Sequence, residues 1–313
     1  IDEQFVVDFV ENYKEVLEEI KPSFFETTVV MAFKAFAGRQ VDIAIIETGM
    51  GGRLDSTNVI DPLISVITNI GLDHQQFLGE TIAEIAGEKA GIIKANTHVI
   101  IGEYDKDSYP VFKRVADASH SKLINAFDEE LFQKTSDLKG TYQAKNLRTA
   151  KVALKELAAF GFNLEESTID EAFGTIMPLT GFSGRWQILQ EEPRVILDCA
   201  HNEDGIQMVL DALKNESYKQ LHWVYGTVND KAYQQILEVL PINASYYWCA
   251  ADIPRALGVD VLHSYTQEIG LSGNRFSSVT QAFEAAKSQA KSGDLILVCG
   301  SVFVVGEIVA SFS

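Results

Sequence analysis

Positive charge is scarce in this sequence. Lysines and arginines number 26 against 44 aspartates and glutamates, which gives the 313 residues a formal net charge of −18. Surfaces that bind nucleic acids or anionic membranes non-specifically need a cationic excess. The composition therefore predicts that neither is a partner, although a local basic pocket could still hold an anionic small molecule.

Cysteines and long apolar runs are also few. Cys199, Cys249 and Cys299 form an odd, scattered set, so we expect reduced core residues of a cytoplasmic protein in preference to a reactive thiol. No stretch is long or apolar enough to span a bilayer, and no signal peptide opens the chain. The chain enters a helical pattern directly from Ile1, which suggests that a further segment precedes it.

What the sequence does contain is typical of an α/β protein of two domains. Its 313 residues exceed one ordinary domain. Apolar residues at helical spacing predict helices over 3–20, 26–38 and 143–160, and a final helix from about Phe303. Short continuous apolar runs are typical of strands buried on both faces of a parallel sheet. They occur at 41–47, 63–70, 97–103, 194–200, 221–226, 246–250 and 294–300.

Strands that alternate with helices predict doubly wound layers around mainly parallel sheets. Thr81 and Glu84 form a capping box that starts one helix, and Ser278 caps another. The stretch 177–185 is the best linker candidate. We therefore predict a first domain over 1–180, a linker over 181–186 and a smaller second domain over 187–313.

Ligands of open parallel sheets bind beyond the carboxyl ends of the strands. Four segments fall at such ends, namely Glu47, 71–74, 198–202 and 226–231. The first of them opens "ETGMGGRLDSTN", which fails the dinucleotide-binding pattern G-x-G-x-x-G, because Leu54 stands where the third glycine or alanine is needed. The remaining interpretation is a glycine loop that lets a substrate approach the backbone.

Glu47 and His74 stand at the ends of two strands that should be neighbours. A carboxylate and an imidazole, together with oxygens of phosphate and water, would make a Mg²⁺ site in a nucleotide enzyme. The alternative is that Glu47 caps a loop and His74 is a turn histidine. Lys89 lies beside glycines on a helix that faces the same edge, where a solvated helix lysine is the ordinary interpretation.

The segment "DCAHN" places Asp198, His201 and Asn202 together at the end of a buried strand. This set could orient a ribose or a phosphate. A turn in which Asp and Asn bond their own backbone explains the same residues equally well, because both patterns fit the helix start that follows.

Several motifs together resemble the folylpolyglutamate synthase/dihydrofolate synthase family, a branch of the Mur ligase superfamily, from the first residues to the last. These motifs are "IETGMGGRLDSTN", "TNIGLDHQQFLG", "IAGEKAGII", "GTYQAKNLRTA", "GRWQIL", "ILDCAHNEDG", "DIPRALG" and "LVCGSVFVVGE". The resemblance implies a monomeric ATP-dependent ligase. ATP would phosphorylate a carboxylate of folate or dihydropteroate, and the amino group of L-glutamate would attack the acyl phosphate to form an amide.

The resemblance also implies roles for single residues. Glu47 and His74 match Mg²⁺ ligands, and Lys89 matches a catalytic lysine that becomes carbamylated and helps hold a second Mg²⁺. The residues that match the nucleotide side are Asn146, Arg185, Asp198 and Asn202, with His201 beside them as a catalytic residue. The residues that match the loop on the folate side are Gly51, Gly52, Arg53, Asp55 and Asn58.

The sequence departs from the family at its phosphate-binding loop. The motif G-x-x-G-K-[ST] has no counterpart, so the chain alone is expected to be inactive. In the family this loop lies upstream of the segment that resembles 1–4. Either the native protein carries it there, or the chain is a ligase relic. We favour the former, because a decayed gene need not have kept the metal and nucleotide residues together.

Two smaller departures concern loops, since 125–140 is short and Glu203 replaces the usual proline. Two other functions stay open, a Mur enzyme that acts on a UDP-sugar substrate and a binding module that no longer turns over nucleotide.

Overall fold

The computed structural model describes all residues except 73, 230–232 and 313. Its contacts divide the chain into two compact units. The first unit consists of residues 1–129 with 156–162, and the second of residues 130–155 with 163–313. The division at 181–186 stays a prediction.

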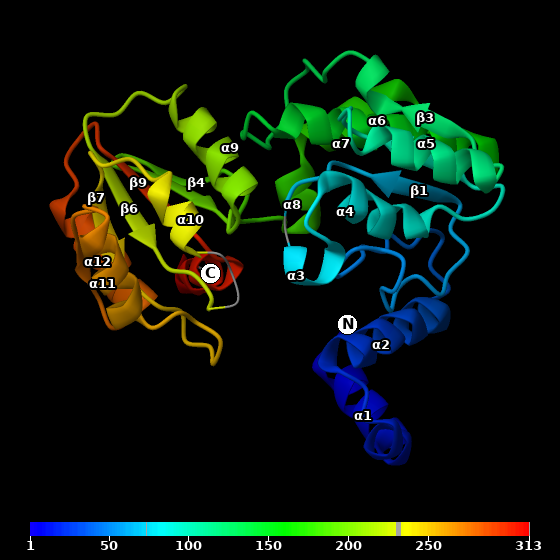
Figure 1. The fold of residues 1–313 in the computed structure, drawn as a ribbon, viewed down its shortest axis with the longest axis horizontal. Coiled ribbons are helices and arrows are strands. Elements are labelled where there is room, and N and C mark those ends of the chain that lie inside the picture. The colour runs from blue at the N-terminus through cyan, green and yellow to red at the C-terminus, as the bar shows by residue number, and fades with distance from the viewer. Residues whose placement is uncertain (73, 230–232, 313) are drawn as a thin grey trace. The chain divides into compact units, whose positions relative to one another are not determined.

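The first unit is built on a small parallel sheet (Figure 1). Its helices are α1 (Glu3–Ile20), α2 (Phe24–Arg39), α3 (Gln75–Leu78), α4 (Ile82–Lys89) and α5 (Tyr109–Ala118). Its strands are β1 (Ile64–Ile67), β2 (His98–Ile101) and β3 (Leu123–Asn125), which pair in parallel in that order. The strands, α4 and α5 share one apolar core that includes Ile67, Ala86, Val99 and Phe112.

The helix starts of this unit follow from local sequence. The Thr81 hydroxyl accepts a hydrogen bond from the Glu84 backbone N–H, and the Glu84 carboxylate accepts one from Thr81 N, which confirms the predicted capping box of α4. Ser23 and Glu26 form the same arrangement at α2. Each box satisfies N–H groups that the first helical turn leaves without a partner.

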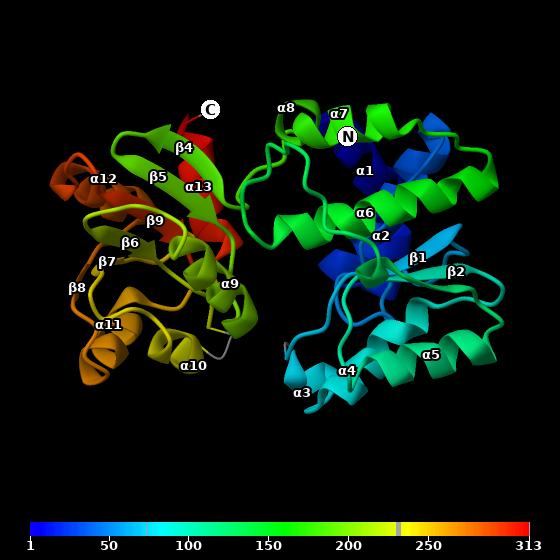
Figure 2. The ribbon, with the colours of Figure 1, turned by 90° about the horizontal axis from the view of Figure 1, so that it is seen from above.

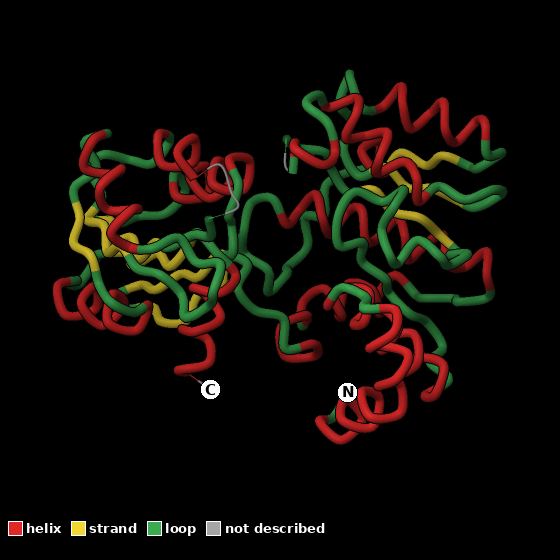
Figure 3. Tube along the Cα trace, turned by 60° about the horizontal axis from the view of Figure 1, so that its bottom comes forward, coloured by secondary structure: helices red, strands yellow, loops and turns green. Residues whose placement is uncertain are grey.

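The strand predicted over 41–47 is wrong. Between α2 and β1 the chain has no regular structure, and Figure 3 shows this segment as loop. Ile45 is 92% exposed. An apolar run supplies strand propensity, but a strand also needs a neighbouring backbone to bond with. Among the described residues no strand pairs with this segment, and β1 is an edge of its sheet.

The second unit contains a larger, mixed sheet. Its helices are α6 (Gln143–Glu156, with its last residue in the first unit), α7 (Glu166–Gly174), α8 (Ile176–Thr180), α9 (Glu203–Leu213), α10 (Tyr233–Glu238), α11 (Val259–Glu268), α12 (Val279–Gln289) and α13 (Val302–Phe312). Its strands are β4 (Gln187–Glu191), β5 (Arg194–Asp198), β6 (Leu221–Tyr225), β7 (Ser245–Trp248), β8 (Gly273–Arg275) and β9 (Leu295–Cys299).

The strand order of this sheet is β4-β5-β9-β6-β7-β8, and only β4 runs antiparallel to its neighbour. Helices α9, α10 and α11 cover one face and α12 and α13 cover the other (Figure 2), each over its own apolar core. All residues of β6 and β9 are buried. The predicted α/β fold with double-sided winding is therefore confirmed for this unit.

Some elements were not predicted. Helix α5 and strand β3 lie between residues 104 and 142, where the sequence analysis predicts no element, and β4 and β8 were missed. Strand β8, "GNR", contains no apolar residue, and only its pairing with β7 makes it a strand. The helix of residues 143–160 is confirmed as α6 followed by a 3₁₀ turn over Leu157–Phe160.

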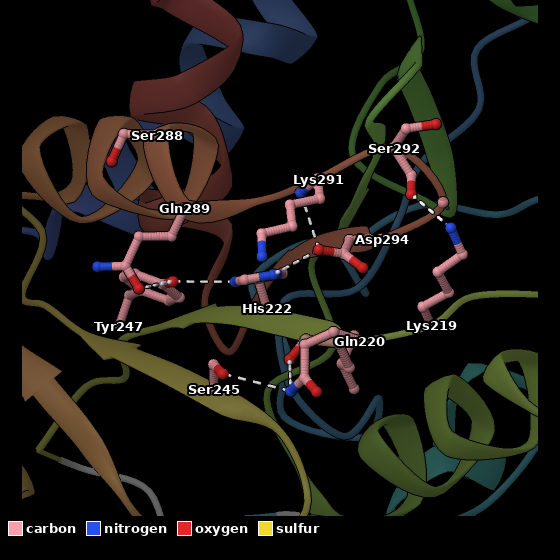
Figure 4. A network of polar contacts seen from close by, with 12 residues as sticks. Lys219, Gln220, His222, Ser245, Tyr247, Ser288, Gln289, Lys291, Ser292 and Asp294 are labelled. Carbon is pink, nitrogen blue, oxygen red and sulfur yellow. Dashed lines mark hydrogen bonds and ion pairs between the residues drawn. The ribbon is translucent and has the colours of Figure 1, made fainter.

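A chain of buried polar groups closes the amino-terminal edge of this sheet (Figure 4). His222 Nε2 lies 3.3 Å from Asp294 Oδ2, and His222 Nδ1 lies 2.9 Å from the Tyr247 hydroxyl. Asp294 also accepts a hydrogen bond from Lys291 N. The two side chains of the His222–Asp294 pair are 6% and 8% exposed. The pair therefore joins the starts of β6 and β9 within the core.

The three cysteines are free and buried, as predicted. Burial raises the pKa of Cys199 to about 11, which keeps the thiol protonated and unreactive at neutral pH. In the part of the chain that is described, no helix combines the length and the apolar character needed to cross a membrane.

Candidate functional site

Asp198 ends β5 at the carboxyl edge of the larger sheet, where ligands of such sheets bind. The residue is 2% exposed. Its Oδ1 accepts a hydrogen bond from Ala200 N at 2.9 Å, and its Oδ2 accepts from Trp186 N at 2.9 Å and from the Tyr142 hydroxyl at 2.7 Å. Both carboxylate oxygens are thus engaged within the second unit.

The loop before β4 folds back onto this carboxylate. Cys199 N donates to Gly184 O, and a Cβ on Gly184 would lie 2.8 Å from Cys199 Sγ. Trp186 has a φ of 47°, which is the left-handed region that a bulky residue rarely adopts. The hydrogen bond from Trp186 N to the Asp198 carboxylate holds this turn in place.

Two opposing effects act on the Asp198 carboxyl. Burial raises its pKa, and hydrogen bonds from Tyr142, Ala200 and Trp186 together with the charge of Arg185 act to lower it. The net shift is upward. Burial also raises the pKa of Tyr142, so this hydroxyl remains a protonated donor at neutral pH.

Helix α6 begins at this point of the second unit. Tyr142 precedes the helix, and the Asn146 backbone N–H donates to Tyr142 O. The Asn146 side chain is exposed and donates to Gln143 Oε1 at 3.0 Å. The predicted nucleotide residues Asn146 and Asp198 are therefore linked through a residue that sequence reasoning did not select, Tyr142.

His201 and Asn202 follow directly. His201 Nδ1 lies 2.9 Å from Cys199 O, and Asn202 is the N-cap of α9, where its Oδ1 accepts from Gly205 N. The backbone hydrogen bonds of the turn interpretation of "DCAHN" are present, since Asp198 also bonds the backbone two residues on, and the ligand roles of these residues stay predictions. Arg185 is exposed, and its charge acts on Asp198.

In the first unit, the predicted folate-side loop packs against the helix that carries Lys89. A Cβ on Gly52 would lie 2.9 Å from the carbonyl oxygens of both Glu88 and Lys89, so only glycine allows this approach. Gly51, with a φ of 66°, approaches Leu78 of α3 in the same way. The two glycines thus place the loop against α4 and against the helix that follows His74.

Polar side chains of the loop hold its shape. The Arg53 guanidinium donates to both Glu88 carboxylate oxygens, at 2.9 to 3.2 Å. Asp55 accepts from Met50 N and from Thr57, and these hydrogen bonds outweigh its partial burial and lower its pKa. Asn58 Nδ2 donates to Gly91 O. The ligand roles of Arg53, Asp55 and Asn58 stay predictions.

The three predicted metal residues occupy different local structures. Glu47 is exposed in the irregular segment, His74 has a φ of 51° and is the N-cap residue of α3, and Lys89 is the half-buried last residue of α4. Among the described residues no group of three His, Cys, Asp or Glu side chains could hold a metal. Mg²⁺ commonly takes only one or two carboxylates, with water and substrate phosphates completing the shell, and the metal roles of the three residues stay predictions.

Parts of two predicted segments lie outside the described residues. They are Asp73 of the segment 71–74 and Asp230 and Lys231 of the segment 226–231. Two residues of evident structural importance were missed, Tyr142 and Glu88. The only sequence signal for Tyr142 was its place inside the motif "GTYQAKN".

Comparison with known families gives two matches that together cover most of the chain. The model described as the Mur ligase middle domain matches residues 10–164. The model described as the Mur ligase, glutamate ligase domain matches residues 184–302.

Two curated proteins resemble the chain closely. A dihydrofolate synthase/folylpolyglutamate synthase of Bacillus subtilis is 33% identical over 316 residues, covering 92% of this chain and 72% of the relative. A probable bifunctional folylpolyglutamate synthase/dihydropteroate synthase of Haloferax volcanii is 32% identical over 311 residues, covering 91% of this chain and 36% of the relative. The chain therefore spans only part of each.

A solved structure agrees with these matches. It is a bifunctional folylpolyglutamate synthase/dihydrofolate synthase with Mn, AMPPNP and L-glutamate bound, and it is 26% identical to this chain. The TM-score is 0.78, and the match covers 93% of this chain and 72% of that chain. The resemblance inferred from the motifs and the α/β fold class are thereby confirmed.

Proposed function

The chain belongs to the folylpolyglutamate synthase/dihydrofolate synthase family of Mur ligases. We propose that it forms the larger part of an ATP-dependent ligase that joins L-glutamate to folate or dihydropteroate. The γ-phosphoryl group passes to a substrate carboxylate. The glutamate amino group then attacks the acyl carbon, the amide bond forms, and inorganic phosphate leaves. Catalysis of this kind depends mainly on positioning and on neutralisation of phosphate charge.

The second unit supplies the nucleotide side of the proposal. Asp198, Asn146 and Arg185 contact ATP, and Asn202 lies beside them. The observation that carries this assignment is the hydrogen bond from Tyr142 to Asp198, because it places the start of the Asn146 helix at the carboxyl end of β5. His201, three residues beyond Asp198, acts on the reacting groups.

The first unit supplies the metal side. Glu47 and His74 hold one divalent cation, and Lys89, as a carbamate, helps hold a second. A carbamate converts the lysine cation into an anion, which explains how such a side chain can serve a metal. When bound, Mg²⁺ would neutralise the phosphates of ATP. A solved relative binds Mn with AMPPNP and L-glutamate, which supports a nucleotide-linked cation here.

The loop from Gly51 to Asn58 lines the pterin side. Its shape is fixed by Arg53, Asp55 and the contacts of Gly52 with α4, so the loop presents backbone groups that are already ordered. A pre-ordered loop loses little conformational entropy when substrate binds. A monomeric state and a cytoplasmic location stay predictions from the sequence.

A chimera tests the ligase function. Residues 1–313 replace the matched part of the Bacillus subtilis relative, and phosphate release is measured with ATP, L-glutamate and either dihydropteroate or a tetrahydrofolate. We expect release that requires all three compounds. A matched chimera that carries His201→Ala should lose most of this activity.

Two results would redirect the proposal. Phosphate release with a UDP-sugar acceptor, without phosphate release with a pterin acceptor, would indicate a peptidoglycan ligase. A folded chimera that binds ADP but releases no phosphate with any acceptor would indicate a binding module.

A further inference from the structure

The Asp198 carboxylate accepts three hydrogen bonds of 2.7 to 2.9 Å and is 2% exposed. Two of them, from Trp186 N and from the Tyr142 hydroxyl, end on Oδ2 and occupy both lone pairs of that oxygen. A ligand hydroxyl that bonds to Oδ2 must therefore displace one of these two donors.

The three donors differ in how they are attached. Ala200 N lies two residues along the chain, and Trp186 N belongs to the loop that folds back on β5. Moving either donor would disrupt backbone next to the sheet. The third donor is a side-chain hydroxyl, that of Tyr142, 56 positions away in sequence. Tyr142 is only half-buried and can turn away by rotation about its side-chain bonds.

The chemistry of the third donor is also that of the ligand. A ribose hydroxyl and a tyrosine hydroxyl both present one O–H to a carboxylate, and charge-assisted bonds of this type are short, as is the 2.7 Å bond here. We propose that the Tyr142 hydroxyl occupies the place of a nucleotide ribose hydroxyl on Asp198, and that nucleotide binding exchanges one for the other. This inference rests on the proposed nucleotide role of Asp198.

The exchange leaves the start of α6 in place. The Asn146 N–H donates to the main-chain oxygen of Tyr142, and rotation of the Tyr142 side chain does not break this bond. The apparent affinity of the protein for nucleotide is lowered by the fraction of molecules in which Tyr142 holds Asp198.

The test measures the binding of ADP and of 2′,3′-dideoxy-ADP to the whole chain by calorimetry. For Tyr142→Phe we expect the Kd of ADP to fall by about ten-fold, on the order of one charge-assisted hydrogen bond. The Kd of the dideoxy compound, which has no ribose hydroxyl to offer, should not change. Tyr246→Phe is the matched control, because Tyr246 also donates a 2.7 Å hydrogen bond, to Pro241 O, and should leave both values unchanged.

The outcomes separate this inference from the proposed function. Unchanged or weaker ADP binding by a folded Tyr142→Phe protein, with ADP bound by the wild type, overturns the exchange and leaves the nucleotide site standing. If Tyr142→Phe binds ADP and the dideoxy compound more tightly by the same factor, the exchange is also overturned, since the ribose hydroxyl would then play no part. If neither protein binds ADP, both are compared again within the chimera, which supplies the phosphate-binding loop, and absence of ADP binding there overturns the nucleotide assignment and the exchange with it. Thermal melting of all three proteins confirms that each is folded.

Discussion

Gly91 and Arg53 are in backbone contact across the junction between α4 and the loop from Gly51 to Asn58. A Cβ on Gly91 would overlap the backbone of Arg53, and Arg53 N in turn donates to Glu88 O at 2.8 Å. The loop and the helix that ends at Lys89 are thus fixed to each other by main-chain groups as well as by the Arg53–Glu88 ion pair.

This contact predicts that Gly91→Ala destabilises the protein by roughly 1–3 kcal/mol, the usual cost of overpacking. Denaturant unfolding measures the change. Gly87→Ala is the matched control, because a Cβ there meets nothing within 4 Å and alanine favours a helix by up to about 1 kcal/mol. Equal stability of Gly91→Ala and wild type would contradict the close packing.

The missing phosphate-binding motif predicts that the chain alone hydrolyses ATP weakly or not at all. The lysine and the hydroxyl that hold the β- and γ-phosphates have no counterpart in the sequence. Phosphate release by the purified chain, with and without a pterin substrate and L-glutamate, is the measurement. Robust turnover would show that other residues replace that motif.

The proposed carbamate on Lys89 predicts a bicarbonate-dependent signal. With ¹³C-bicarbonate, wild-type protein should give a carbamate resonance in the ¹³C NMR spectrum, and Lys89→Ala should not. Lys106→Ala, which removes a lysine elsewhere in the first unit, should keep the signal. In the chimera, Lys89→Ala should lose activity and regain part of it with short carboxylates. Identical spectra for wild type and Lys89→Ala would refute the carbamate.

The lowered pKa of Asp294 predicts how the stability of the fold depends on pH. The hydrogen bond from Lys291 N, followed by that from His222, lowers the pKa of this carboxyl. A lowered folded-state pKa means that the carboxylate stabilises the fold above its unfolded pKa of about 3.9, and that this contribution is lost as the pH falls through the folded value.

Asp294→Asn should therefore be less stable than wild type at pH 7, with a difference that narrows below about pH 4. Urea unfolding at several pH values measures this. Asp252→Asn, which changes an exposed carboxylate of the same unit, is the control. A difference that is constant down to pH 2 would show that charge on Asp294 does not matter.

What could be predicted from the sequence was local in origin. The capping box of Thr81 and Glu84 lies within one helical turn, so four residues suffice to recognise it. The helix α6 and the buried strands β5, β6 and β9 follow from runs of apolar residues. The proximity of Asp198, His201 and Asn202 could be predicted because the three residues lie within five positions of one another in the sequence.

What failed depended on distant partners. The run 41–47 has strong strand propensity but finds no strand beside it among the described residues, whereas "GNR" of β8 has little propensity and pairs with β7. The partnership of Arg53 with Glu88 spans 35 positions, and that of Tyr142 with Asp198 spans 56. Neither periodicity nor motif spacing predicts contacts between residues so far apart in sequence.

The uncovered run at 41–47 has a consequence for handling the protein. Val41, Ile43 and Ile45 are β-formers at alternate positions, all of them exposed, and an exposed segment of this kind that pairs with no described strand is a template for association between molecules. Aspartate and glutamate at 42 and 47 oppose this through charge repulsion. Raising the salt concentration or lowering the pH toward the isoelectric point near 4.7 should therefore promote aggregation of the purified chain.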